Sequence, residues 1–317
     1  MMAGRQTWGN DLSPVAALVA RARTRLLEPG QRKGLQSATQ RTVKTATALT
    51  SQQLQAPEPV LPLTDWYEAH VLRELTALHD AIETVDEAET RRLLWAMHSS
   101  LVVKYSLRAS DTSARRVKRK VKKGAVLQAF TARGVELVRM LDELARSVPE
   151  GTPAAKLRRG DVREVDGTFD LVVTSPPYPG TYDYLPLQHL RLAWLGHLEA
   201  LSEQDHEIGP RRDFKSSAEE GYRRWQTSTA AWTAAVARVL TPGGHMAVVV
   251  GDGISHGRLL EARGPTMDAA AAAGMAPFAT ASIERADPAT GLAKREHVLV
   301  FHRPKPTDDE AVEEETP

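Results

Sequence analysis

The sequence predicts an α/β protein: a Rossmann-like sandwich with a mostly parallel sheet, a C-terminal hairpin and a helical insert. The first observation is an apolar run at residues 169–173 that ends abruptly in Ser175, Pro176, Pro177 and Tyr178. The run is typical of a strand buried on both faces, and the prolines stop it. The second is a helical segment up to Val239, followed by a Gly-Gly turn and an apolar run that ends at Gly251.

The N-terminal residues predict a strand that ends near Gly9 and a helix that begins at Ser13 and Pro14. Serine is favoured as the N-cap and proline as the first helical residue. Asp11 therefore lies at a strand end, where an acidic residue typically binds ribose hydroxyls. The other interpretation of Asp11 is a second helix-capping group.

Between Asp11 and Asp161 the sequence predicts a long, mostly helical insert. Apolar residues recur at helical spacing in residues 66–85, 90–107 and 125–147. Residues 35–54 show weak periodicity, and residues 56–62 form a proline-rich connector.

Two further strand regions are expected. One ends near Arg159, just before Gly160 and Asp161, and its carboxylate could accept from the amino group of an adenine. The alternative for Asp161 is an ordinary turn aspartate. The other region is a hairpin of residues 279–284 and 296–301, joined by a loop at residues 287–291.

The four residues from Ser175 to Tyr178, here called the Ser-Pro-Pro-Tyr turn, place reactive groups where ligands bind in open α/β sheets. An exocyclic amine of a nucleobase is a poor nucleophile, because its lone pair is delocalised into the ring. Two acceptors, Ser175 Oγ and the Pro176 carbonyl, would favour its tetrahedral, nucleophilic form. Pro177 stiffens the loop before substrate arrives. Tyr178 offers a ring for stacking on a flipped base. The turn therefore predicts amine methylation, and the alternative is a strand exit without chemistry.

The chain resembles the S-adenosylmethionine (SAM)-dependent amino-group DNA methyltransferases, the N4-cytosine/N6-adenine class. The resemblance covers most of residues 5–303, and the Ser-Pro-Pro-Tyr turn is its most specific part. The other segments that carry it are residues 10–14, 160–161, 240–244 and 295–301.

The resemblance implies a SAM-methyltransferase sandwich, SAM as cofactor, and double-stranded DNA with a flipped base as substrate. It makes Ser175, Pro176, Pro177 and Tyr178 catalytic. It implies that the cofactor is bound by Asp11, Asp161 and Thr174. Serine at the first position of the turn favours cytosine N4 over adenine N6.

One departure from the family concerns its Gly-rich cofactor loop, which lies upstream of the ribose-binding aspartate. Only ten residues precede Asp11, and they contain no such loop. This leaves three expectations open: a truncated reading frame, a second polypeptide that supplies the loop, or a non-catalytic DNA-binding remnant. An RNA (tRNA) amino-group methyltransferase is a further alternative, because such enzymes use the same turn. A cognate restriction enzyme is a partner that the family also suggests.

The composition excludes several classes. The chain has no cysteine, which rules out disulfides, cysteine-ligated zinc and the thiolate that cytosine carbon-5 methylation needs. The histidines are scattered without ligand spacing, so we expect no metal. No run of 18 apolar residues and no charged-then-apolar leader occurs, so we expect no membrane partner and a cytoplasmic location.

The charge distribution predicts a nucleic-acid contact. Residues 304–317 hold six acidic residues and one lysine, which predicts a disordered acidic tail. Residues 104–123 hold nine Lys or Arg and one acid, with interspersed hydroxyls that suit phosphate contacts. The alternative is a solvated helix face. The candidate DNA-binding residues are Arg115, Arg116, Lys118, Arg119 and Lys120, with Tyr182 and Tyr184 beside the Ser-Pro-Pro-Tyr turn.

The expected domain organisation follows from these segments. Residues 1–30 begin the methyltransferase core, and residues 31–150 form the helical insert and target-recognition region. Residues 151–303 form the catalytic core, and residues 304–317 form the tail.

Overall fold

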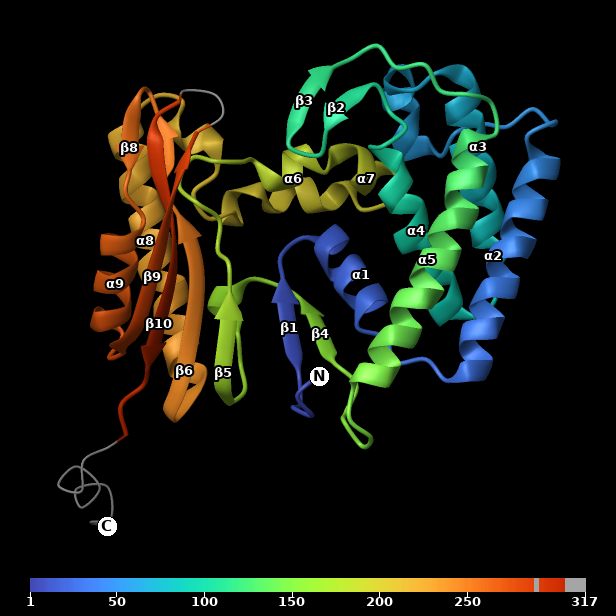
Figure 1. Ribbon diagram of the computed structural model, residues 1–317. Coiled ribbons are helices and arrows are strands. Elements are labelled where there is room, and N and C mark those ends of the chain that lie inside the picture. Colours follow the sequence, from blue (N-terminus) through green and yellow to red (C-terminus); the bar gives the residue numbers. More distant parts are fainter. Residues whose placement is uncertain (288–290, 306–317) are drawn as a thin grey trace. The chain divides into compact units, whose positions relative to one another are not determined.

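The computed structural model of the chain describes residues 1–287 and 291–305 (Figure 1). The chain divides into two compact units. Unit 1 comprises Met1–Gly160 and Leu185–Gln204, and unit 2 comprises Asp161–Tyr184 and the chain from Asp205 onward. The predicted tail lies outside the described residues, apart from Pro304 and Lys305.

Unit 1 is a helical assembly attached to a short parallel strand pair (Figure 1). β1 (Trp8–Asp11) pairs with β4 (Lys156–Arg159), and both contact helix α1 (Pro14–Arg23). Ser13 is the N-cap of α1, and its hydroxyl accepts a hydrogen bond from Ala16 N at 3.3 Å, as the sequence predicts. Both predicted strand ends in this unit are confirmed to within two residues.

The helical insert is confirmed, although several of its boundaries differ from those predicted. Helix α5 begins and ends where the sequence predicts, and the weakly periodic residues 35–54 contribute to a 21-residue helix, α2. The proline-rich connector forms part of a 3-10 segment, η1. The elements of the insert are α2 (Pro29–Leu49), η1 (Glu58–Trp66), α3 (Ala69–Glu83), α4 (Ala88–Val102), β2 (Arg108–Ser110), β3 (Ser113–Arg116) and α5 (Ala125–Ser147).

The helices of the insert share one core with α1 and with residues 190–194. Apolar side chains of α2 to α5 pack together, among them Leu35, Leu75, Leu94 and Phe130, each at most 1% exposed. The segment Leu185–Gln204 adds α6 (Tyr184–Leu187) and α7 (His189–Trp194) to this unit, with η3 (Leu198–His206) at its end. None of the described helices is both long and apolar enough to cross a bilayer.

Unit 2 is built on a four-stranded sheet in the order β5-β6-β10-β9. β5 (Phe169–Thr174) and β6 (Leu240–Gly251) are parallel, whereas β9 (Ala276–Ala286) and β10 (Ala293–His302) form the predicted antiparallel hairpin. The other elements are η2 (Val162–Glu164), η4 (Arg211–Phe214), α8 (Ala218–Val239), β7 (Gly253–Ser255), β8 (Arg258–Leu260) and α9 (Arg263–Ala272). The α/β class predicted from the sequence is confirmed.

Helices α8 and α9 cover one face of this sheet (Figure 1). Met246, Val248 and Val250 of β6 point to that face and are fully buried. Trp232 of α8 and Leu299 of β10 complete this core, each at most 2% exposed. The alternation of buried and half-buried residues along β6 is the period-two pattern of a strand with one face on a core.

The prediction that β5 is buried on both faces is wrong. Leu171 is 49% exposed and Val173 is 71% exposed. Side chains alternate between the two faces of a strand, so Leu171 and Val173 share one face, whereas Val172 packs on the core of unit 2 at the other face. β5 is also an edge strand, which pairs with β6 and with no other strand of the described residues. Apolarity in an edge strand is unusual, because an unpaired apolar edge is a template for further strand pairing.

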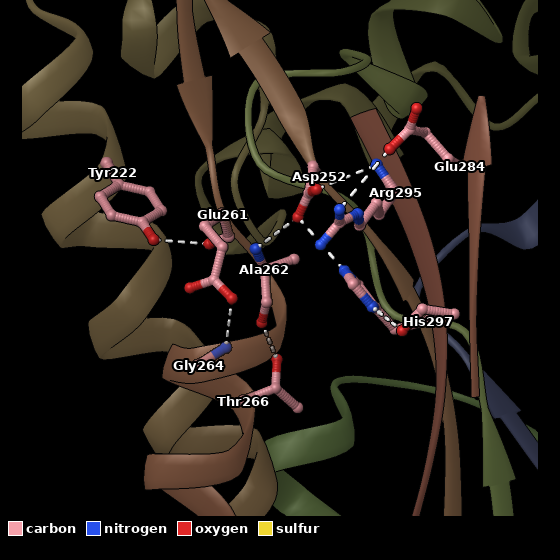
Figure 2. A network of polar contacts seen from close by, with 10 residues as sticks. Tyr222, Asp252, Glu261, Ala262, Gly264, Thr266, Glu284, Arg295 and His297 are labelled. Atoms are coloured by element: carbon pink, nitrogen blue, oxygen red, sulfur yellow. Dashed lines mark hydrogen bonds and ion pairs between the residues drawn. The ribbon is translucent and has the colours of Figure 1, made fainter. Parts of the chain in front are cut away.

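The carboxyl end of β6 is fixed by a buried carboxylate (Figure 2). Asp252 is 3% exposed and accepts hydrogen bonds from Ala262 N at 2.8 Å and Arg295 N at 3.0 Å. Its own backbone N–H donates to Arg295 O at 2.8 Å. Ala262 is the N-cap of α9, so one side chain joins the end of β6 to β10 and to the start of α9.

We expect Asp252→Ala to destabilise unit 2 by about 3 kcal/mol, because two backbone donors lose their acceptor in a buried region. Asp252→Asn keeps one side-chain oxygen and should lose less. The measurement is urea unfolding followed by tryptophan fluorescence. The control is Asp268→Ala on α9, an exposed aspartate, whose effect should stay within about 0.5 kcal/mol. Equal stability of Asp252→Ala and Asp268→Ala would contradict the structural role of Asp252.

Candidate active site

The Ser-Pro-Pro-Tyr turn leaves the sheet at the carboxyl end of β5. Thr174 is the last residue of that strand and is paired in register with Val248 of β6. Ser175 is exposed, and Pro176, Pro177 and Tyr178 are half-buried. The turn is thus accessible at its first residue and is packed against unit 2 at the following three.

The middle of the turn is held by a buried tryptophan of α8. Trp225 is 1% exposed, and its indole Nε1 donates to the Pro177 carbonyl at 3.1 Å. Tyr222 lies parallel to this indole, with ring centroids 5.8 Å apart. Gly209 packs on the same ring, where a Cβ would lie 2.3 Å from Trp225 Cδ1. Only glycine fits at position 209 without moving Trp225.

The aromatic ring of the turn is held from two sides. The Tyr178 hydroxyl donates to Glu296 Oε1 of β10 at 2.8 Å, and the ring packs on Gly251, where a Cβ would lie 2.6 Å from Cε2. Arg285 Nη2 lies 2.9 Å from the other Glu296 oxygen, so the carboxylate is itself oriented. Two elements distant in sequence therefore fix the plane and the hydroxyl of Tyr178.

The surroundings of Tyr178 also set its acidity. Burial and the neighbouring Glu296 carboxylate raise the pKa of Tyr178 to about 12, against an opposing hydrogen bond with Ser175. Tyr178 is therefore a neutral hydrogen-bond donor at neutral pH. Tyr178 therefore does not act as a tyrosinate that accepts a proton in the reaction.

The chain after the turn is tied down by backbone contacts. Gly180 N donates to Gly209 O at 3.0 Å. Pro179 lies so close to Gly253 that a Cβ there would be 1.9 Å from the Pro179 carbonyl oxygen. The rings of Tyr182 and Tyr184 contact each other edge-on at 5.6 Å, and Tyr184 is 40% exposed. This pair forms an aromatic surface close to Tyr178, whose pKa Tyr184 also raises.

The two predicted cofactor carboxylates both have local partners. In unit 1, Asp11 Oδ1 accepts from Ser13 N at 2.8 Å, which is the helix-capping interpretation of that residue. In unit 2, Asp161 caps η2 and accepts from the Arg163 backbone at 2.8 Å and from its side chain. Burial raises the pKa of Asp161, but the hydrogen bonds from Arg163 outweigh it, so the pKa lies below its ordinary value.

The basic segment of unit 1 forms the β2-β3 hairpin and the irregular chain that follows it, which carries Lys118, Arg119 and Lys120, instead of a helix face. Arg116 and Arg119 donate to backbone carbonyls of Asp65, Lys104 and Arg108, and these bonds hold the hairpin. The side chains of Arg115, Lys118 and Lys120 are exposed and have no hydrogen bond or ion pair within the described part of the chain. The five nominated cations therefore divide into two that support structure and three that are available to a ligand.

Sequence reasoning missed the residues that fix the turn. Trp225, Glu296 and Asp252 come from α8, β10 and the end of β6, and their distance along the chain from residue 175 hid them. The glycines at 251 and 253 follow a strand directly and were the one available signal of close backbone approach. Within residues 1–287 and 291–305, no group of three His, Asp or Glu could hold a metal ion.

Comparison with known proteins gives only distant similarities. No protein-family model matches the chain, and no curated protein matches it. Among solved structures, a "Putative DNA Modification Methylase" from Thermus thermophilus, complexed with SAM, has 22% identity and a TM-score of 0.29. The match covers 50% of this chain and 58% of the Thermus protein, so this chain spans little more than half of that length.

A second solved structure is a SAM-dependent methyltransferase from Methanosarcina mazei. It has 10% identity to this chain and a TM-score of 0.28. The match covers 54% of this chain and 79% of that protein.

We expect Glu296→Gln to lower the pKa of Tyr178 from about 12 toward the ordinary 10.0, because it removes the charge that opposes ionisation. Burial should keep the pKa above the ordinary value. Tyrosinate absorbance after a pH jump measures it, with Tyr178→Phe subtracted to isolate one of the six tyrosines. The matched control is Glu284→Gln on β9. An unchanged Tyr178 titration in Glu296→Gln would show that the two side chains do not interact.

Proposed function

We propose that the protein is a SAM-dependent methyltransferase that acts on the exocyclic amino group of a flipped DNA base, with cytosine N4 favoured over adenine N6. The observation that carries this proposal is the Ser-Pro-Pro-Tyr turn at the carboxyl end of β5, held by Trp225, Gly251 and Glu296. A catalytic loop that is fixed before substrate binds avoids an ordering cost during the reaction. The resemblance in sequence supports the same chemistry.

The two proline carbonyl groups of the turn have different roles. The Pro177 carbonyl accepts from Trp225, whereas the Pro176 carbonyl has no hydrogen bond within the described residues. We assign Pro176 O and the exposed Ser175 Oγ as the two acceptors for the amine hydrogens. Their pull on these hydrogens would direct the nitrogen lone pair away from the ring and toward the methyl donor.

Tyr178 and its neighbours would hold the base. A ring fixed by Glu296 and Gly251 is a rigid platform, and stacking on an aromatic ring contributes about 1–3 kcal/mol per base. Tyr182 and Tyr184 supply a second aromatic surface. Stacking of this size can offset the few kcal/mol that base flipping costs.

SAM would supply a methyl group activated by its sulfonium charge. We assign Asp161 to the adenine amino group and Asp11 to the ribose hydroxyls, as the resemblance implies. The lowered pKa of Asp161 keeps it ionised and able to accept. Thr174, the last residue of β5, would lie beside the cofactor.

A second polypeptide is part of this proposal. β5 keeps an edge without a strand partner among the described residues, and Leu171 and Val173 on one of its faces are exposed. A strand that ends in a glycine-rich turn would pair with the free edge of β5. The cytoplasmic location and a cognate restriction enzyme stay sequence-based predictions.

We expect this chain alone to bind SAM weakly, with a dissociation constant on the order of millimolar, because Asp11, Asp161 and Thr174 are the only cofactor contacts that we assign. Calorimetry with SAM and S-adenosylhomocysteine measures it, and Asp161→Ala should remove the residual heat. The control is Asp268→Ala, which changes an exposed aspartate. Micromolar binding by the wild type would instead show that no second polypeptide is needed.

We expect Ser175→Ala and Tyr178→Ala to reduce methyl transfer from SAM to duplex DNA about a hundredfold or more, since each removes a group that positions or activates the amine. The assay uses saturating SAM and follows labelled methyl groups, with the methylated base identified by mass spectrometry. Ser216→Ala, an exposed serine, is the matched control. Full activity in Ser175→Ala, or a preference for structured RNA over duplex DNA, would overturn the assignment.

We propose that the exposed cations of the hairpin and of the chain that follows it contact DNA phosphates. Lys118→Gln with Lys120→Gln should lower the slope of log affinity against log salt by about 2, because each phosphate contact contributes about 0.9. Lys33→Gln with Lys44→Gln on α2 removes the same charge from exposed positions and is the control. Equal slopes for both double variants would place the DNA elsewhere.

A further inference from the structure

Unit 1 contains a cavity of about 620 Å³ that none of the proposed catalytic or cofactor residues lines. Its walls come from α1, α3, α4, the end of α7, residues 57 and 59, and Arg159 of β4. The volume lies in the range typical of small-molecule sites, about 300–1,000 Å³. The cavity is therefore large enough for a nucleotide.

Arginines outnumber carboxylates in the lining of this cavity. Four arginines line it, Arg21, Arg91, Arg92 and Arg159, against one carboxylate, Glu83. Arg92 forms an ion pair with Glu89, and Arg159 forms one with Glu203 at 2.6 Å. These ion pairs neutralise Arg92 and Arg159 but not Arg21 and Arg91.

Arg21 and Arg91 have no acidic partner within the described residues. Arg21 donates to Leu157 O at 3.2 Å and Arg91 to Val85 O at 2.8 Å, and both acceptors are neutral carbonyls. Arg21 comes from α1 and Arg91 from α4, so two elements of the lining each carry a guanidinium charge that an anion in the cavity can neutralise. Guanidinium groups bind phosphate through paired N–H donors, so a phosphate is the anion that these residues suit.

An aromatic side chain lies beside these cations. Trp95 is half-buried and follows Arg91 by one helical turn on α4, so both side chains share one face of the helix. The indole contacts His79 at 5.0 Å and His98 at 5.3 Å, both edge-on. Trp95 lines the cavity and both ring contacts are T-shaped, so the part of the indole that reaches the cavity can contact a planar ligand.

We propose that this cavity binds a nucleotide, with its base on Trp95, its phosphate on Arg91 one helical turn before Trp95, and Arg21 as a second cation of the lining. Neither half of the site suffices alone: the arginines would accept any small anion, and the indole would accept any flat ring. Their combination within one cavity selects a ligand that carries both groups. The nucleotide could be free or part of a single strand.

The test is calorimetry with deoxycytidine 5′-monophosphate, deoxycytidine, inorganic phosphate and a short single-stranded oligothymidylate. We expect the monophosphate to bind at least about tenfold more tightly than the nucleoside or phosphate, because it contacts both halves of the site. Tighter binding of the oligonucleotide than of the monophosphate, lost in Trp95→Leu, would identify a strand as the source, because binding to the exposed cations near Lys118 does not depend on Trp95. Tighter binding of the monophosphate would identify a free nucleotide.

Variants separate the two halves of the site. Trp95→Leu keeps most of the apolar volume and should weaken monophosphate binding about tenfold, with phosphate binding unchanged. Arg91→Gln should weaken monophosphate and phosphate alike. Arg139→Gln on α5, whose side chain is 65% exposed, is the control.

Two results would overturn the proposal: wild-type binding of phosphate as tight as that of the monophosphate, or unchanged binding in both Trp95→Leu and Arg91→Gln. A thermal melt of each variant separates loss of binding from loss of folding, and Arg21→Gln replaces Arg91→Gln if the latter unfolds. Binding here requires neither SAM nor the Ser-Pro-Pro-Tyr turn. Absence of nucleotide binding in this cavity would therefore not contradict the proposed methyl transfer. Absence of methyl transfer would likewise not contradict nucleotide binding in this cavity.

Discussion

The parallel pairing of β5 with β6 is the constraint on which unit 2 depends. It sets Thr174 beside Val248, so that the Ser-Pro-Pro-Tyr turn leaves the sheet where β6 is about to end in Gly251 and Asp252. In a parallel pair both carboxyl ends lie at the same edge, and ligands bind at that edge in open α/β sheets. The register brings the turn and the end of β6 together, and the other contacts of the site follow from it.

Close packing at that edge is made with glycine and with two long-range hydrogen bonds. Gly251 admits the Tyr178 ring, Gly253 admits the Pro179 backbone, and a side chain at either position would overlap them. Trp225 and Glu296 then fix the Pro177 carbonyl and the Tyr178 hydroxyl. The turn is rigid because its neighbours are rigid, as well as through its own prolines.

Two surfaces of the chain carry groups that the described residues leave without a partner. One is β5, which has an edge without a strand partner and carries the exposed Leu171 and Val173 on one face. The other is the set of cations in unit 1, on and after the β2-β3 hairpin and around the cavity beside Trp95. An unpaired strand edge can pair with a strand of another polypeptide, and a guanidinium group without an acidic partner can bind an anion. The two surfaces therefore indicate different kinds of partner.

The sequence by itself determined the α/β class, the helix at residues 125–147, the Ser13 cap, the C-terminal hairpin and the position of the turn after β5. Local rules suffice for these, because caps, prolines and apolar periodicity act within a few residues. Only the tertiary structure decided that β5 is exposed, since an apolar run looks the same in a central strand and at an edge. It likewise decided that Arg116 and Arg119 support a hairpin and that Trp225, Glu296 and Asp252 fix the site. Those contacts join residues far apart in the chain, and no local pattern encodes such pairs.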